Sequence, residues 1–210
     1  LFNLRLGRWS PNPARAKWRK PSPSFGLVCL LQELLGYSNE QRSFVSLSDG
    51  GHFENLALYE LVRRRCKVIF VVDAAADATR TFDDLANAIR KCRVDFGVEI
   101  DFPQLELLRG DDSLRAEQGF ISGRITYDPA DPGQNGTIVL IKPTMRRAQD
   151  EPADVLNYAA KNPPFPQQST ADQFFDESQF ESYRRLGLFI GQQCLEKHAE
   201  LLPECPPPPT

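Results

Sequence analysis

Residues 43–72 constrain the fold most, because they predict a strand, a tight turn, a helix and a second strand in direct succession. Residues 44–47 are an apolar run that ends at Ser-Asp-Gly-Gly, and an amphipathic helix is expected to begin near His52. The second run, residues 67–72, is apolar and β-branched, which is typical of a central strand covered on both faces. This order predicts an α/β fold in which a right-handed crossover joins two strands of one sheet.

Asp49 is the candidate functional residue of this stretch. It follows the first strand, and in open α/β sheets ligands and catalytic groups collect at the carboxyl ends of strands. Gly50 and Gly51 allow a sharp turn, through backbone angles barred to other residues, and leave the carboxylate uncrowded. The structural alternative is a cap that accepts hydrogen bonds from the first amides of the helix. The spacing alone favours the cap slightly and leaves both roles open.

Long strings of this sequence resemble one enzyme family. Residues 49–74 read DGGHFENLALYELVRRRCKVIFVVDA, and they resemble the aspartate motif and following helix of the patatin-like phospholipases, in the large bacterial branch related to cytosolic phospholipase A2. The resemblance continues through FDDLANAIRKCRVDFGVEI at residues 82–100 and through the tail that starts EPADVLNYAAKNPPFPQQ at residue 151. It therefore covers nearly the whole chain.

The resemblance implies a three-layer α/β/α sandwich with a mixed central sheet, of which this chain is the C-terminal portion. It also implies a lipid acyl hydrolase, a phospholipase or esterase, that uses a serine and aspartate dyad without histidine. Asp49 matches the dyad aspartate, and Gly50 and Gly51 match the loop that supports it. The family's serine lies on a G-x-S-x-G turn, which this sequence lacks, since the string around Ser122 reads GFISG. The serine is therefore expected in an upstream part of the same polypeptide.

Two other functions compete with the hydrolase. A non-catalytic lipid- or partner-binding module of the same fold would keep these elements without the nucleophile. A nucleotide-binding domain is disfavoured because neither G-x-G-x-x-G nor a phosphate-binding loop is present. The expected partners are the upstream part of the polypeptide, a phospholipid or other acyl-ester substrate, and a membrane surface. The expected location is the cytoplasmic face, with membrane association through upstream segments outside this sequence.

The composition gives little reason to expect a metal site, a cofactor or a nucleic-acid partner. The five cysteines form no C-x-x-C pair and there are only two histidines, so no metal and no cofactor are expected. The acidic loop with Asp128, Asp131 and Asn135 lacks the order of a calcium loop, and Asp73 and Asp77 are expected to have a capping or hydrogen-bonding role before the next helix. A net charge of −3 gives no attraction for nucleic acid, and no nucleic acid partner is expected.

Three segments are expected along the chain: a basic arm or linker packed on the domain at residues 1–24, the hydrolase part at residues 25–202, and a proline-rich tail at residues 203–210. The arm has six Lys and Arg in its first 20 residues, together with Trp9 and Trp18, a composition that suits a membrane interface. Its prolines favour an irregular segment on the domain surface instead.

The remaining elements follow from periodicity and turn residues. Residues 25–35 predict a buried helix, residues 82–96 an amphipathic helix, and residues 98–102 a short strand. Residues 119–127 and 137–142 predict a hairpin, and residues 152–161 and 171–200 predict two helices. The last of these has a wide apolar stripe that is expected to pack in the core.

Overall fold

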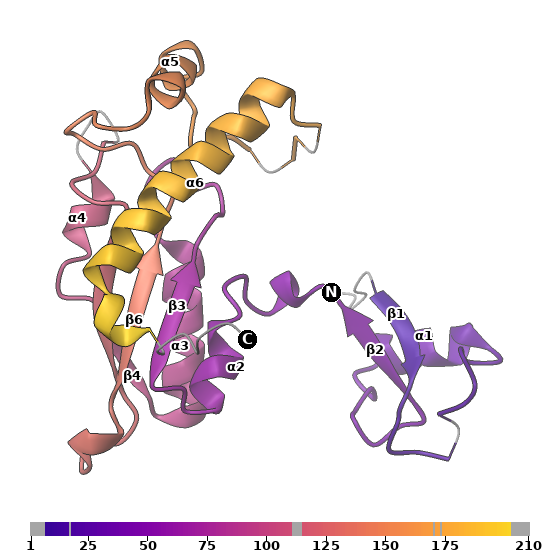
Figure 1. The fold of residues 1–210 in the computed structure, drawn as a ribbon. Coiled ribbons are helices and arrows are strands. Elements are labelled where there is room, and N and C mark those ends of the chain that lie inside the picture. The colour runs from indigo at the N-terminus through magenta and orange to yellow at the C-terminus, as the bar shows by residue number, and fades with distance from the viewer. Residues whose placement is uncertain (1–6, 17, 111–114, 170, 173, 203–210) are drawn as a thin grey trace, which may run out of the picture. The chain divides into compact units, whose positions relative to one another are not determined.

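The chain divides into two compact units. The computed structural model describes residues 7–16, 18–110, 115–169, 171–172 and 174–202. Leu1–Phe53 forms the N-terminal unit and Glu54–Thr210 the C-terminal unit (Figure 1), so the division lies within the expected hydrolase segment 25–202 and not at residue 24. The proline-rich tail at residues 203–210 lies outside the described residues, as do residues 1–6 and 17 of the basic arm.

The N-terminal unit is built on a two-stranded antiparallel sheet. Strand β1 (Gly7–Pro11) pairs with β2 (Phe44–Ser48), with Arg8 opposite Leu47. The strand expected at residues 44–47 is confirmed. The expectation of an irregular arm is wrong for Gly7–Pro11, because β2 supplies a hydrogen-bonding partner that local sequence cannot reveal, and the first proline is only the last residue of the strand.

Helix α1 (Gly26–Leu34) forms where a helix was expected, but it is not buried. Its buried residues are Cys29 and Glu33, whereas Leu27 is 52% and Leu31 46% exposed. The prediction of a core helix is therefore wrong: the helix turns its one acidic residue inward and most of its leucines outward. An apolar composition alone does not determine whether another part of the protein covers a helix.

The C-terminal unit is built on a mixed four-stranded sheet in the order β3-β6-β5-β4. Strand β3 (Val68–Val72) is parallel to β6 (Gly136–Ile141), while β5 (Phe120–Thr126) is antiparallel to both β6 and β4 (Glu99–Asp101). The hairpin of β5 and β6 and the mixed α/β class are confirmed. The predicted crossover is wrong, because β2 pairs with β1 in the other unit and not in the sheet of β3.

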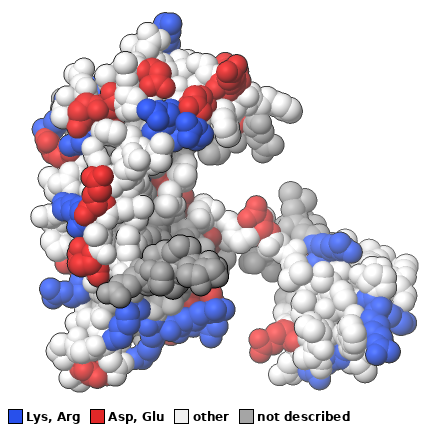
Figure 2. All heavy atoms as spheres, viewed as in Figure 1, with Lys and Arg blue, Asp and Glu red and all other residues white. Residues whose placement is uncertain are grey.

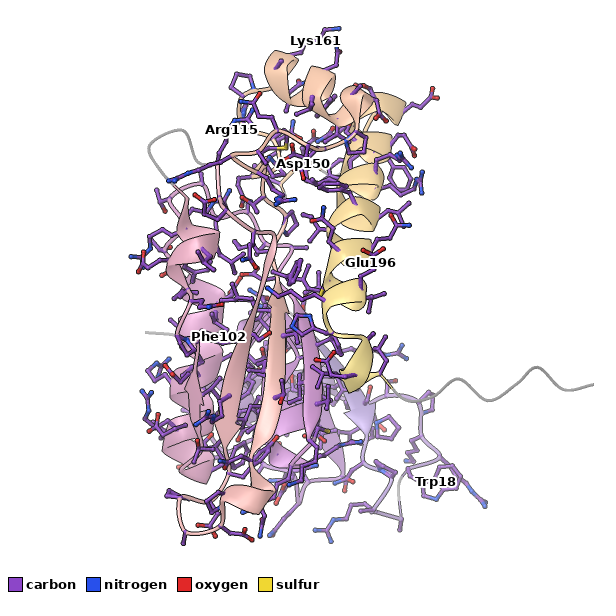
Figure 3. All side chains as sticks on the ribbon, turned by 60° about the vertical axis from the view of Figure 1, so that its left-hand side comes forward. Trp18, Phe102, Arg115, Asp150, Lys161 and Glu196 are labelled. Atoms are coloured by element: carbon purple, nitrogen blue, oxygen red, sulfur yellow. The ribbon has the colours of Figure 1, made fainter. Side chains whose placement is uncertain are left out.

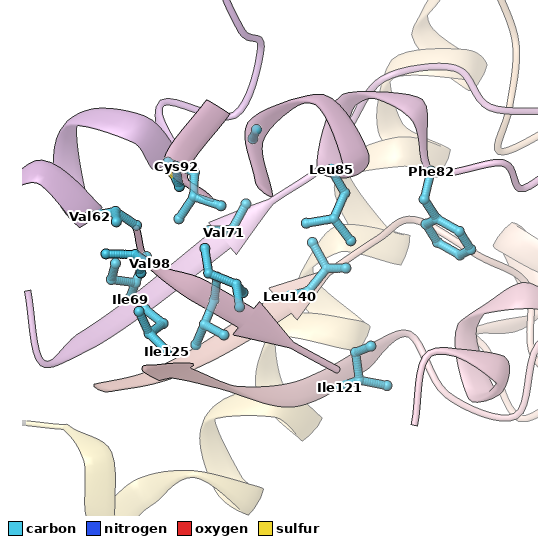
Figure 4. Close-up of a cluster of buried hydrophobic side chains, with 14 of the residues drawn as sticks. Val62, Ile69, Val71, Phe82, Leu85, Cys92, Val98, Ile121, Ile125 and Leu140 are labelled. Atoms are coloured by element: carbon cyan, nitrogen blue, oxygen red, sulfur yellow. The ribbon is translucent and has the colours of Figure 1, made fainter. Parts of the chain in front are cut away.

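Helices cover both faces of this sheet. Helices α2 (Leu58–Arg63), α3 (Asp83–Phe96) and α4 (Glu106–Arg109) pack on one face, where they bury Ile138 and Leu140 of β6 (Figure 4). Helix α6 (Glu177–Lys197) packs on the other face against Val139, and α5 (Ala153–Lys161) packs against α6 beyond the end of the sheet (Figure 1). The alternation along β6 follows from the two-residue period of a strand.

The apolar stripe expected before and along α6 is only partly in the core. Leu186 and Ile190 are buried against the sheet, as predicted. Phe174 is 93% exposed, and Phe175 and Phe180 are also exposed, so the prediction is wrong for these three. Helix α6 begins only at Glu177, where the Asp176 side chain accepts a hydrogen bond from the Gln179 amide, and Phe174 precedes it.

Strand β3 is an edge strand of this sheet, which contradicts the expectation of a central strand. Its two faces are covered as expected, since Ile69 and Val71 pack in one core cluster and Phe70 packs against the other. In its parallel pairing with β6, Thr137 donates to the Lys67 carbonyl and Asp73 donates to the Ile141 carbonyl. The backbone groups of the alternate residues Val68, Phe70 and Val72 therefore point away from β6. The Val72 side chain is 60% exposed. The sequence shows that β3 is apolar but not how many strands flank it.

A glycine-to-alanine pair tests the packing of this sheet. A Cβ at Gly123 of β5 would lie 2.5 Å from the Asp101 carbonyl oxygen and 2.7 Å from the ring of Phe102, which is labelled in Figure 3. Gly123→Ala should therefore lower the free energy of unfolding in urea by about 1–3 kcal/mol. Gly187→Ala in α6 meets no atom within 4 Å and should be neutral or stabilising. Equal stability of Gly123→Ala and wild type would contradict the described packing of β4 on β5.

Candidate functional site

Asp49 lies exposed directly after β2, at the start of a three-residue 3-10 helix η1 (Gly50–His52). Its Oδ1 accepts a hydrogen bond from the Gly51 amide at 2.9 Å, which confirms the capping interaction. Its second oxygen, Oδ2, accepts no hydrogen bond from the residues that the structure describes. One oxygen thus fixes the side chain while the other stays open to a further donor.

Neither glycine after Asp49 has an unusual backbone. The expectation that these glycines need a left-handed backbone is wrong, because neither Gly50 nor Gly51 is among the described residues with positive φ. A Cβ at Gly50 would meet no heavy atom within 4 Å, so the absent side chain of Gly50 leaves the surface next to Asp49 uncrowded.

The helix expected at His52 begins only at Leu58, as α2. The cause lies in Glu54, whose buried carboxylate accepts hydrogen bonds from the Leu56 amide at 2.8 Å and the Tyr59 amide at 3.4 Å. A side chain that binds nearby amides competes with the helical hydrogen bonds of the same segment. His52 itself places Nδ1 3.1 Å from the Asp49 carbonyl oxygen.

A serine–histidine pair in the C-terminal unit was missed by the sequence analysis. The Ser122 Oγ lies 2.6 Å from Nε2 of the buried His198, and His198 Nδ1 lies 2.9 Å from the Cys194 carbonyl oxygen. Because a carbonyl oxygen only accepts, Nδ1 carries a hydrogen and Nε2 of the neutral ring accepts from the hydroxyl. The two residues are 76 positions apart, so no local motif signals their contact.

Ser122 and His198 have the contact and the adjacent hollow expected of a nucleophile and its base, but Ser122 is not on the turn expected of such a nucleophile. Ser122 lines an open hollow of about 590 Å³, together with Arg124 and Asp101. A serine activated by histidine is an established nucleophile. Here, however, Ser122 lies within the regular strand β5 and not on the strained turn that exposes such a serine. The contact also gives hydrogen-bond partners to polar atoms at the buried end of α6, and this structural role explains the contact without catalysis.

A buried ion pair joins the carboxyl ends of the parallel strands β3 and β6. The fully buried Lys142 places Nζ 2.9 Å from Asp73 Oδ2 and 3.9 Å from Asp77 Oδ2. Asp77 also accepts hydrogen bonds from the amides of Thr81 and Phe82, which confirms a hydrogen-bonding role. It does not cap α3, because the N-cap residue of that helix is Phe82 and has no side-chain cap. Burial would raise the pKa of Asp77, but these two amides and Lys142 outweigh it and lower that pKa.

The acidic loop around η2 (Pro132–Gln134) has local roles in the turn. Asp128 accepts from the Ala130 amide at 2.9 Å and Asp131 from the Gly133 amide at 3.1 Å. Among the described residues, no group of three His, Cys, Asp or Glu side chains is placed to hold a metal ion. Nor does any helix in the described part of the chain have the length and apolarity needed to cross a membrane.

Comparisons of the chain with protein-family models, with curated proteins and with solved structures give no match.

Proposed function

We propose that this chain is the C-terminal part of a patatin-like lipid acyl hydrolase, and that Asp49 is the aspartate of its serine–aspartate dyad. The observation that carries the proposal is the exposed Asp49 carboxylate, with Oδ1 held by the Gly51 amide and Oδ2 unengaged by the described residues. The DGG string and the sequences that follow it supply the family resemblance. The mixed sheet with helices on both faces is compatible with the three-layer α/β/α sandwich of that family.

In this mechanism Asp49 acts as the general base. Oδ2 accepts the hydroxyl proton of the serine as its oxygen attacks the acyl carbonyl, and backbone amides of the upstream segment stabilise the oxyanion. The Gly51 hydrogen bond limits rotation of the carboxylate, which keeps Oδ2 aimed at its partner. The open space beside Gly50 leaves room for the serine to come within hydrogen-bonding distance. His52 has no role in these steps.

The substrate class follows from the family resemblance: a phospholipid or another acyl ester. The alternative is a non-catalytic lipid- or partner-binding module of the same fold, in which Asp49 only caps η1. Ser122 and His198 supply the observation for a third arrangement, in which the chain carries its own nucleophile.

A covalent serine probe separates these arrangements. The complete protein, treated with a fluorophosphonate and analysed by peptide mass spectrometry, should be labelled on one serine outside these 210 residues. Pre-incubation with an acyl-ester substrate should slow the labelling. Label on Ser122 would transfer the nucleophile to the pair with His198, and a protein that takes up no label would favour the non-catalytic module.

A further inference from the structure

The two units carry opposite net charge. Residues 1–53 contain seven Lys and Arg against three Asp and Glu, a formal charge of +4, whereas residues 54–210 carry 18 against 25, a formal charge of −7. On the face shown in Figure 2, blue side chains predominate on the unit that contains β1 and β2. A basic unit attached to an acidic one indicates a partner with negative charge for the basic part.

The surface around α1 is apolar as well as basic. We define the α1 surface by Trp18, Phe25, Val28 and Leu31, which are exposed, together with Lys20 and Arg42. Trp18 is 51% exposed and is labelled in Figure 3, and the Arg19 guanidinium lies 5.1 Å from the centroid of its ring. An exposed apolar cluster of this kind in a soluble unit marks a contact surface.

The cations and the apolar side chains of this surface meet in one groove. Lys20 and Arg42 line a hollow of about 340 Å³ together with Phe25 and Val28. Within the described residues, the side chains of Lys20 and Arg42 form no ion pair and no hydrogen bond. Two cations in the lining of one groove with apolar side chains match a ligand with an anionic head and an apolar chain.

We propose that the α1 surface docks on an anionic phospholipid membrane. Phe25, Val28 and Leu31 enter the boundary between headgroups and acyl chains, Lys20 and Arg42 contact the lipid phosphates, and Trp18 lies at the headgroup level, where indole rings are favoured. The charge of this unit favours an anionic lipid surface over the same unit of a second copy, since two N-terminal units of charge +4 repel each other. The inference does not depend on the hydrolase proposal, because it concerns binding and not chemistry.

The test is co-sedimentation of the complete protein with phosphatidylcholine vesicles that contain or lack phosphatidylserine. We expect binding to the anionic vesicles, with a blue shift of tryptophan fluorescence and a loss of binding at high salt. Lys20→Ala with Arg42→Ala should weaken the affinity about thirty-fold, since each basic residue near an anionic surface contributes about five-fold. Val28→Ser with Leu31→Ser should weaken it about tenfold or more.

Matched controls come from the C-terminal unit. Lys161 and Val94 are also exposed, so Lys161→Ala and Val94→Ser remove comparable groups outside the α1 surface and should leave vesicle binding unchanged. Quenching of tryptophan by brominated lipid, measured on the wild type, tests contact even if a variant misfolds. Equal binding by all variants, or no quenching, would overturn the proposal. Self-association abolished by Val28→Ser with Leu31→Ser, without vesicle binding, would show that a second copy covers this surface instead.

Discussion

Lys142→Ala should lower the free energy of unfolding by about 3–5 kcal/mol, because it leaves the buried Asp73 carboxylate without its cation. Nζ of Lys142 lies 2.9 Å from Asp73 Oδ2 and 3.4 Å from the Ala75 carbonyl oxygen, and both charged side chains are almost fully buried. The substitution removes the ammonium group that joins the ends of β3 and β6. The same group lies near the carboxylate of Asp77. Urea unfolding monitored by circular dichroism measures the change.

Two further variants show whether the charge pair causes the loss. Lys67 is exposed and its Nζ donates to the Gly133 carbonyl at 2.8 Å, so Lys67→Ala should cost less than about 1 kcal/mol. Lys142→Met combined with Asp73→Leu removes both charges at similar volume and should recover most of the stability lost in Lys142→Ala. A Lys142→Ala protein as stable as Lys67→Ala would contradict the buried pair.

Asp49→Asn should lower the rate of ester hydrolysis by the complete protein by about 10² to 10⁴, which is the usual contribution of a general base. The amide of asparagine keeps an oxygen that can accept from the Gly51 amide, so the turn is retained, but it cannot take up the serine proton. The measurement is kcat for a short-chain ester.

Asp131 provides the matched control for this substitution. It is exposed, precedes the 3-10 helix η2 and accepts from the amide two residues later, as Asp49 does before η1. Asp131→Asn should therefore show how much an Asp-to-Asn change destabilises such a turn, and it should leave kcat unchanged. An equal loss of activity in both variants would indicate a structural effect and not the loss of a base.

The elements that sequence predicts well are those whose pattern is set locally. Helix α3 and the β5–β6 hairpin have clear periodicity and turn residues, and each of their ends lies within one residue of the expected position. The hydrogen-bonding role of Asp77 follows in the same way, because its partners, the amides of Thr81 and Phe82, are four and five residues away.

The errors concern partners that are distant in sequence. The strand at residues 44–47 was paired with the wrong sheet, and β3 was assumed to be central, because an apolar run indicates burial but not which strand lies beside it. The α1 helix was placed in the core on composition, although its leucines face outward. Ser122 with His198 and Lys142 with Asp73 are contacts across 76 and 69 residues, for which a single sequence has no signal.

The central claim is that Asp49 takes the proton of a serine supplied by another segment of the polypeptide. The most direct measurement is the rate at which a fluorophosphonate phosphonylates the complete protein, compared between wild type and Asp49→Asn, because attack on phosphorus with loss of fluoride requires the activated serine itself. We expect the label on a serine outside these 210 residues and phosphonylation slowed about 10² to 10⁴ by the substitution. Phosphonylation of Asp49→Asn within twofold of the wild-type rate, or label on Ser122, would contradict this claim.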